Sequence, residues 1–413
     1  MCPAGRVGLA AWLAALLACA LPPAFAQADA AGAPPAVTTA ELPQPEQPGP
    51  GFDGPVIGTR IGPGLTVGGY GTLQLIVPGL GTSQKAALPP GASPTGWHPG
   101  ARQGQSSAQG VGSVPGKPFS DAQAASRSRL SISHLSAMLW WEPSPVWKLL
   151  AEVDSQDVVQ LPAHESGRDG DNSSPYVALE RLYVEHRASD AFSLRVGKFL
   201  TPIGRWNQDH PDPLTWTTLR PLISQSAFPT NATGVMAFGS LPGGLGADWQ
   251  AFASAGSNWR SGPRTDPFTR AGGVRVVLPL SPEFQLGASA ARYKQLDAHD
   301  DRRRLVGLDA VWAGRGGELS AEIIERRGPD GAPDDQERGW FVQAVVPLAP
   351  RLHGVMRIEA YRRAYTSDST RTALVGVVWR SGRHWVFKAE WVRATPSNMG
   401  LAQGLLASMT ALF

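Results

Sequence analysis

The feature that most constrains this chain is a repeated alternation of apolar and polar residues that begins at Leu65 and continues to Phe413. Period-two alternation is the pattern of a β-strand with one apolar face. We distinguish about sixteen such segments, most of them about ten residues long, which is the length that a tilted strand needs to cross a bilayer. They are 65–77, 127–141, 146–158, 176–187, 192–200, 233–241, 245–257, 271–280, 284–295, 302–313, 317–327, 338–347, 352–363, 371–380, 384–394 and 403–413.

The connections between these segments alternate between short and long. The short ones are 142–145, 188–191, 242–244, 281–283, 314–316 and 381–383, and the long ones are 78–126, 159–175, 201–232, 258–270 and 328–337. A transmembrane β-barrel with short periplasmic turns and long extracellular loops produces this alternation, whereas a soluble sandwich has no reason to do so. The sequence therefore predicts an all-β chain that forms an antiparallel, sixteen-stranded transmembrane barrel over residues 65–413.

The amino-terminal residues predict export. Arg6 precedes an Ala- and Leu-rich run from Val7 to Leu21, and Ala24-Phe25-Ala26 fits a small-x-small cleavage site, so residues 1–26 are predicted to be a signal peptide. Cleavage before Cys19, which would then carry a lipid, is the alternative. The Pro- and Gly-rich residues 27–64 predict a periplasmic linker. Both cysteines, Cys2 and Cys19, lie in the signal segment, which excludes a disulfide framework after cleavage at Ala26.

Other classes of protein are excluded by hydropathy and charge. After the signal segment no apolar run reaches the roughly 18 residues that a membrane-spanning helix needs. The formal net charge is +3 and the two signs are interspersed, which gives no electrostatic basis for binding nucleic acid. Strands can cross a membrane only when every edge is paired, as in a closed barrel. We therefore predict a location in the bacterial outer membrane, in contact with its lipid.

The alternation also predicts which side chains face the lumen. In the segment 146–158, Trp147, Leu149, Ala151 and Val153 would face lipid, because the residues between them are mostly polar. Tryptophans at strand ends, Trp140, Trp141, Trp312 and Trp379, fit the aromatic girdles at the membrane interfaces. The charged residues predicted to form the pore wall are Lys148, Glu152, Asp154, Arg181, Arg195, Arg275, Arg357, Glu359, Lys388 and Glu390.

A family resemblance rests on residues near the middle of the chain. The stretch Arg195-Val196-Gly197-Lys198-Phe199, which leads into the long connection 201–232, resembles the phosphate-selective porin family, types O and P. The resemblance is strongest over residues 127–240. It implies a sixteen-stranded, often trimeric channel whose third loop folds into the barrel. The predicted constriction residues on that loop are Arg205, Asn207, Asp209, His210 and Arg220.

These observations predict a porin for passive diffusion of small polar solutes or ions, among them anions such as phosphate. Because the predicted wall mixes both signs, weak selectivity is expected. A non-conducting barrel that serves as a binding or anchor protein is the alternative. A barrel hydrolase that would use His134 or His164 with Ser131, Ser133 or Glu165 is a less favoured one.

The remaining expectations concern partners and cofactors. The carboxyl-terminal alternation that ends in Phe413 resembles the signal that barrel-assembly machinery recognises. Asp209, His210 and Asp212 are interpreted as polar loop residues rather than as a metal site. We expect no cofactor, no metal and no enzymatic activity.

Overall fold

The computed structural model describes residues 58–79, 128–161, 176–209, 211–243, 246–256, 267–295, 302–328, 335–366, 369–395 and 403–413. The predicted signal peptide, most of the predicted linker and most of the loop 78–126 lie outside the described residues. One short helix, α2, is described, and none of the described helices is long and apolar enough to cross a membrane.

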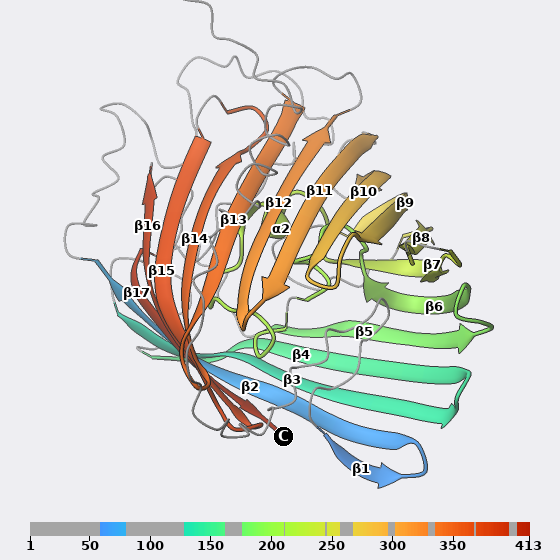
Figure 1. The fold of residues 1–413 in the computed structure, drawn as a ribbon, viewed down its shortest axis with the longest axis horizontal. Helices are drawn as coiled ribbons and strands as arrows, with labels where there is room; N and C mark the ends of the chain where they lie inside the picture. Colours follow the sequence, from blue (N-terminus) through green and yellow to red (C-terminus); the bar gives the residue numbers. More distant parts are fainter. Residues whose placement is uncertain are drawn as a thin grey trace, which may run out of the picture. The chain divides into compact units, whose positions relative to one another are not determined.

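The described residues form one antiparallel sheet (Figure 1). Its strands are β1 Thr59–Gly62, β2 Leu65–Pro78, β3 Arg129–Ser144, β4 Trp147–Leu161, β5 Tyr176–Arg187, β6 Ser193–Leu200, β7 Asn231–Ser240, β8 Asp248–Ser254, β9 Phe268–Pro279, β10 Phe284–Gln295, β11 Arg303–Gly314, β12 Gly317–Arg327, β13 Gln336–Ala349, β14 Leu352–Arg362, β15 Ser369–Ser381, β16 Trp385–Thr395 and β17 Gly404–Leu412. The helix α2, Leu222–Ser226, lies in the connection between β6 and β7.

The sheet closes on itself because the last strand pairs with β2. Leu412 lies opposite Tyr70 and Gly404 opposite Pro78, and each strand from β2 to β17 pairs with the next in the chain. At the end of the seam, Gly69 and Phe413 exchange two backbone hydrogen bonds of 2.9 and 3.0 Å. The closed barrel therefore contains the sixteen strands β2 to β17, which confirms the predicted fold class and strand number.

Two elements were not predicted. The strand β1 falls within the predicted linker 27–64, and it pairs with β2 through Thr59 opposite Val67. The strand β17 pairs with β2 from Tyr70 to Pro78, and β1 pairs with the preceding residues of the same edge, Leu65 to Val67. An open edge with free N–H and C=O groups costs free energy away from water, so a short additional strand at this place completes the seam. The helix α2 was missed because five residues are too few to show a helical period.

The two faces of the barrel wall follow the predicted alternation. The exposed outward positions are mostly apolar, among them Val153, Val196, Val306, Met356 and Val375. At the short-turn end they are joined by exposed aromatic side chains, namely Trp141, Trp147, Phe192, Trp312, Trp379 and Trp385. Such a band with an aromatic rim is what a lipid-facing barrel surface requires. Trp140, which we predicted for the girdle, is instead buried inward beneath Lys148, because two consecutive strand residues cannot share a face.

Candidate functional site

The connection 201–230 between β6 and β7 lies inside the barrel, since its backbone binds inward side chains of distant strands. Three carboxylates accept its N–H groups. Glu322 Oε2 accepts from Arg205 and Trp206 at 3.0 and 3.1 Å. Glu390 accepts from Thr218 and Leu219 at 3.0 and 2.7 Å, and Glu359 accepts from Leu222 at 2.9 Å. Backbone groups that leave water need such partners, so these acids explain why an irregular segment is stable there.

Cations of the same wall bind the oxygen atoms of the segment. Lys388 Nζ donates to the carbonyl of Asp212 at 2.6 Å and to Thr215 Oγ1 at 2.8 Å. Arg380 donates to the carbonyl of Pro213 at 2.8 Å. Arg357 donates to Thr217 Oγ1 and to the carbonyl of Leu219, both at 2.8 Å. The strands β12 and β14 to β16 therefore hold residues 205–222 through both donors and acceptors. We call this part of the chain the lumen loop.

The lumen loop also contacts the strands β3 and β8. The Asp212 carboxylate lies 2.9 Å from Nδ1 of His134 on β3, and Gln208 accepts a hydrogen bond of 3.1 Å from Gln250 on β8. Burial by itself would raise the pKa of Asp212, but the facing His134, Lys388 and Arg220 hold that pKa well below its ordinary value. Asp212 is therefore ionised, and it joins β3 to β16, since its carboxylate faces His134 while its backbone carbonyl accepts from Lys388.

Apolar packing completes the attachment. Trp216 and Leu219 pack against inward side chains that include Val355, Leu374 and Val378. Leu222, Ile223 and Phe228 are fully buried in a second cluster together with Tyr183 and Phe199. This packing was not predicted from the sequence. The sequence feature that indicates it is the presence of Leu, Val and Ile at lumen-facing positions, since apolar side chains are disfavoured on the wall of a water-filled lumen.

The predicted constriction residues lie on the lumen loop but differ in what they contact. Arg205 and Asp209 form an ion pair of 3.4 Å, with side chains 27% and 38% exposed. The Arg220 guanidinium lies 5.4 Å from the centre of the Trp206 ring. Asn207 is buried, and its amide donates to the carbonyls of Thr201 and Thr230. Asn207 therefore holds the loop together rather than facing the lumen, and His210 lies outside the described residues.

The predicted wall residues all face inward, and most are paired rather than exposed. Cross-strand ion pairs join Arg181 to Glu152 at 2.5 Å, Arg195 to Glu185 at 2.7 Å and Arg275 to Asp309 at 2.5 Å. Asp154 accepts a hydrogen bond of 2.9 Å from Gln156. On the other side of the barrel Arg357, Glu359, Lys388 and Glu390 bind the lumen loop, as described above. The sequence reveals which residues face inward but not that the loop would cover so many of them.

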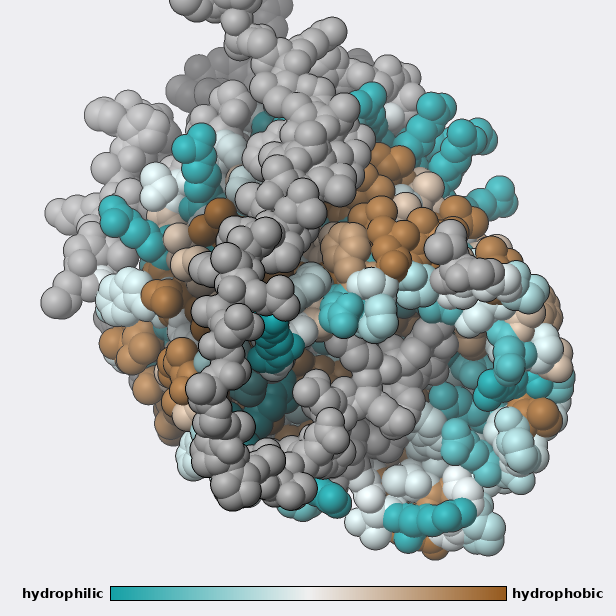
Figure 2. Space-filling model, in the orientation of Figure 1, coloured by the Kyte–Doolittle hydropathy of each residue, from teal (hydrophilic) through white to brown (hydrophobic). Residues whose placement is uncertain are grey.

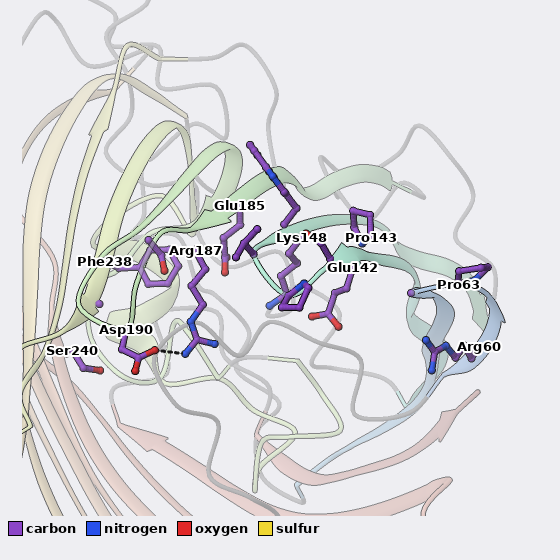
Figure 3. A pocket seen from close by; sticks show the side chains of 17 residues that line it. Arg60, Pro63, Glu142, Pro143, Lys148, Glu185, Arg187, Asp190, Phe238 and Ser240 are labelled. Atoms are coloured by element: carbon purple, nitrogen blue, oxygen red, sulfur yellow. Dashed lines mark hydrogen bonds and ion pairs between the residues drawn. The ribbon is translucent and has the colours of Figure 1, made fainter.

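A cavity of about 1040 Å³ opens at the short-turn end of the barrel (Figure 3). Lys148, Glu185 and Phe238 contribute from the wall, while Arg187 and Asp190 contribute from the β5–β6 turn, where they form an ion pair of 2.6 Å. Arg60 and Pro63 of the β1–β2 hairpin complete its rim. Its lining carries charges of both signs and is polar enough to hold water.

Those residues considered for metal binding or hydrolysis that the structure describes are not brought together. Asp209 pairs with Arg205 and Asp212 with His134, and within the described ranges no group of three or more His, Cys, Asp or Glu side chains is placed to hold a metal ion. The hydroxyl of Ser133 donates to the carbonyl of Thr72 at 3.3 Å. His164 and Glu165 lie outside the described residues.

The turn at Gly204 offers a test of how the lumen loop is seated. Its φ of +65° suits glycine, and a Cβ there would lie 2.3 Å from Glu322 Oε1, the carboxylate that binds the loop. Gly204→Ala should therefore displace the loop and increase the fluctuations of the single-channel current. Gly382→Ala is the matched control, because its φ of +72° imposes similar backbone strain while nothing lies within 4 Å of the added Cβ. Equal current noise in both variants would contradict this account of the turn.

Sequence comparison finds no protein-family model and no curated protein that matches the chain. Solved structures do resemble it. The anion-selective porin of Comamonas acidovorans is 12% identical with a TM-score of 0.53, and the match covers 84% of this chain and 99% of that one. OmpF of Salmonella typhi, in complex with daunomycin, is 10% identical with a TM-score of 0.54, over 84% and 97%.

A third similar structure is the outer-membrane channel DcaP of Acinetobacter baumannii, which is 11% identical with a TM-score of 0.50, over 86% and 99% of the two chains. At such identities the likeness concerns the fold alone. Together with the closed sheet and its apolar outer band, it shows that this chain is a bacterial outer-membrane barrel with the fold of porins.

Proposed function

We propose that the protein is a porin through which small polar solutes and ions diffuse passively, and that the lumen loop narrows its pore. The observation that carries this proposal is the attachment of residues 205–222 across the lumen, to Glu322 on β12, to Glu390 on β16 and to His134 on β3. A segment fixed in this way reduces the cross-section of the lumen. A barrel of sixteen strands is wide enough to leave an aqueous channel beside the segment.

The pairing of charges supports weak selectivity. Selectivity requires one sign to dominate the narrowest part of a pore. Arg181 and Arg195 each face an acid of the neighbouring strand, and Arg275 faces Asp309 two strands away, so their charges are largely compensated. Arg205 pairs with Asp209, whereas Arg220 packs against an aromatic ring and shares the charge of Asp212 with His134 and Lys388. We therefore propose a slight preference for anions, phosphate among them, that depends on Arg220.

Planar-bilayer recording of the refolded mature protein tests the proposal. Discrete conductance steps are expected, and in a salt gradient the reversal potential should show a small anion preference that Arg220→Gln abolishes. Lys148→Gln, which removes a positive charge at the short-turn mouth, is the control and should change the preference less. Absence of steps from protein shown to be folded by heat-modifiable gel mobility would reject the porin and favour a binding or anchor barrel.

Two partners follow from the same proposal. The exposed side chain of Phe413 lies at the end of β17, which supports recognition of this strand by the barrel-assembly machinery. Trimeric assembly, which the family resemblance implies, stays a prediction that analytical ultracentrifugation in detergent can check.

A further inference from the structure

Eight consecutive strands each carry one arginine on the outward face at their long-loop end. These residues, which we call the arginine belt, are Arg270, Arg292, Arg304, Arg327, Arg338, Arg362, Arg371 and Arg393, on β9 to β16 in turn. All are exposed except Arg362, which is half-buried. At the long-loop ends of β2 to β8 and of β17, the described residues include no exposed lysine or arginine. The belt therefore covers one side of the barrel only.

The register places five of the eight arginines directly opposite another arginine. Arg292 lies opposite Arg304, and Arg304 lies opposite Arg327. Arg338 lies opposite Arg362 on the next pair of strands, and Arg270 lies opposite Lys294. Like charges that face each other across a sheet are destabilising, because their Cβ atoms are about 5 Å apart. This repulsion recurs along the rim and favours the binding of an anion that relieves it.

The described residues supply little compensation for these charges. Among the described residues of β9 to β16, Glu325 is the one acid on the outward face at this end, and it pairs with Arg327 at 2.5 Å. The side chain of Arg362 donates to Gln336 at 2.9 Å. Arg270, Arg292, Arg304, Arg338, Arg371 and Arg393 form no ion pair with any residue that the structure describes. Within the described part of the chain, the charges of these six arginines are therefore not compensated by an acid.

The surroundings of the belt indicate where its counterions reside. Toward the short turns, the outward residues that follow are apolar and exposed, as at Val274, Val306, Ile358, Val375 and Trp391. Figure 2 shows this succession, with hydrophilic side chains at the upper right, over the long-loop ends of the strands near β11, and a hydrophobic region beneath them. A ligand that contacts both the arginine belt and the apolar residues next to it carries anionic groups on an apolar body. Arginine is suited to phosphate because its planar guanidinium donates two parallel hydrogen bonds.

We propose that the arginine belt binds the phosphate groups of lipid head groups in the outer leaflet, along β9 to β16. The long loops lie on the extracellular side, so the belt faces that leaflet. A second copy of the chain fits less well, since the outward faces of the described strands offer almost no acid to meet the arginines. The proposal concerns the outside of the barrel and does not depend on whether the pore conducts.

The experiment compares two triple variants of the refolded full mature chain in detergent. Arg292→Gln, Arg304→Gln and Arg338→Gln together remove three belt charges. Arg315→Gln, Arg351→Gln and Arg383→Gln remove three exposed charges from the short turns and serve as the matched control. The probe is lipid A, the phosphorylated glycolipid of bacterial outer leaflets, with phosphatidylcholine as the neutral comparison. Binding is measured by tryptophan fluorescence or native mass spectrometry.

The belt variant should bind lipid A about a hundredfold more weakly, because each arginine near an anionic surface contributes about fivefold in affinity. The control variant should bind as the unaltered protein does, and added salt should weaken binding to the unaltered protein. Equal losses in both variants, or equal binding of lipid A and phosphatidylcholine, would overturn the proposal. A change in oligomeric state that is confined to the belt variant would do the same, since it would assign the surface to a contact between copies.

Discussion

Removing the side chains of Lys388 and Glu390 together should raise the single-channel conductance several-fold. Lys388 holds the carbonyl of Asp212 and the hydroxyl of Thr215, whereas Glu390 receives the N–H groups of Thr218 and Leu219. Without both, the middle of the lumen loop loses its hydrogen bonds to β16 and can move away from the wall. The double substitution Lys388→Ala with Glu390→Ala leaves the net charge unchanged, so a change in current reports the width of the passage rather than its field.

The matched control for this experiment is Glu185→Ala with Arg195→Ala. These two residues also form an inward ion pair, at 2.7 Å, but they join β5 to β6 and not the wall to the loop. The control removes a similar volume and the same two charges. Conductance is recorded in planar bilayers, with heat-modifiable mobility as the criterion of folding. A similar increase in both variants would show that the lumen loop does not set the conductance.

Arg275→Met should lower the free energy of unfolding by about 3–5 kcal/mol, which is the effect of breaking a buried ion pair from one side. Arg275 donates two hydrogen bonds to Asp309, of 2.5 and 2.8 Å, and a third, of 3.1 Å, to Ser289. Both charged side chains are about 5% exposed, and the carboxylate of Glu322 is also buried. After the substitution, the acid remains in a place that water scarcely reaches.

Unfolding by urea, followed by tryptophan fluorescence of the barrel in detergent, measures this loss. Arg187→Met is the control, because Arg187 and Asp190 form their pair with side chains 59% and 87% exposed, where the effect should stay within about 1 kcal/mol. Replacing both partners, as Arg275→Met with Asp309→Leu, should restore much of the stability. If Arg275→Met were no more harmful than Arg187→Met, the ion pair would not stabilise the wall.

The barrel could be predicted from the sequence because lipid imposes a simple rule on it. Outward residues must be apolar and strands must pair on both edges, so alternation and loop lengths together determine the strand number. The predicted segment 317–327 coincides with β12, and 176–187 coincides with β5. The strand β1 escaped prediction because its residues, Thr59 to Gly62, are too few and too polar to alternate visibly.

The interior could be predicted only in part. Alternation reveals that Lys388 and Glu390 face inward, but it carries no information about what lies opposite them. The lumen loop shows no periodic pattern of apolar residues. Its attachment depends on contacts between residues far apart in the sequence, such as Asp212 and His134, which are separated by 78 positions. Asn207 illustrates the difficulty, since a polar residue on a pore loop can as readily bind the loop's own carbonyls as a solute.

The attachment of the lumen loop to β14, β15 and β16 has a consequence for the divergence of homologous sequences. Residues 212–222 of the loop and the inward residues of β14 to β16 form a single packed unit, whereas the cavity-lining positions near Lys148 and Glu185 contact no part of that unit in the hydrogen bonds described. Substitutions in the first set should therefore occur together over evolutionary time. Those in the second set can change one at a time, which makes that side of the barrel the place where new solute preferences can arise.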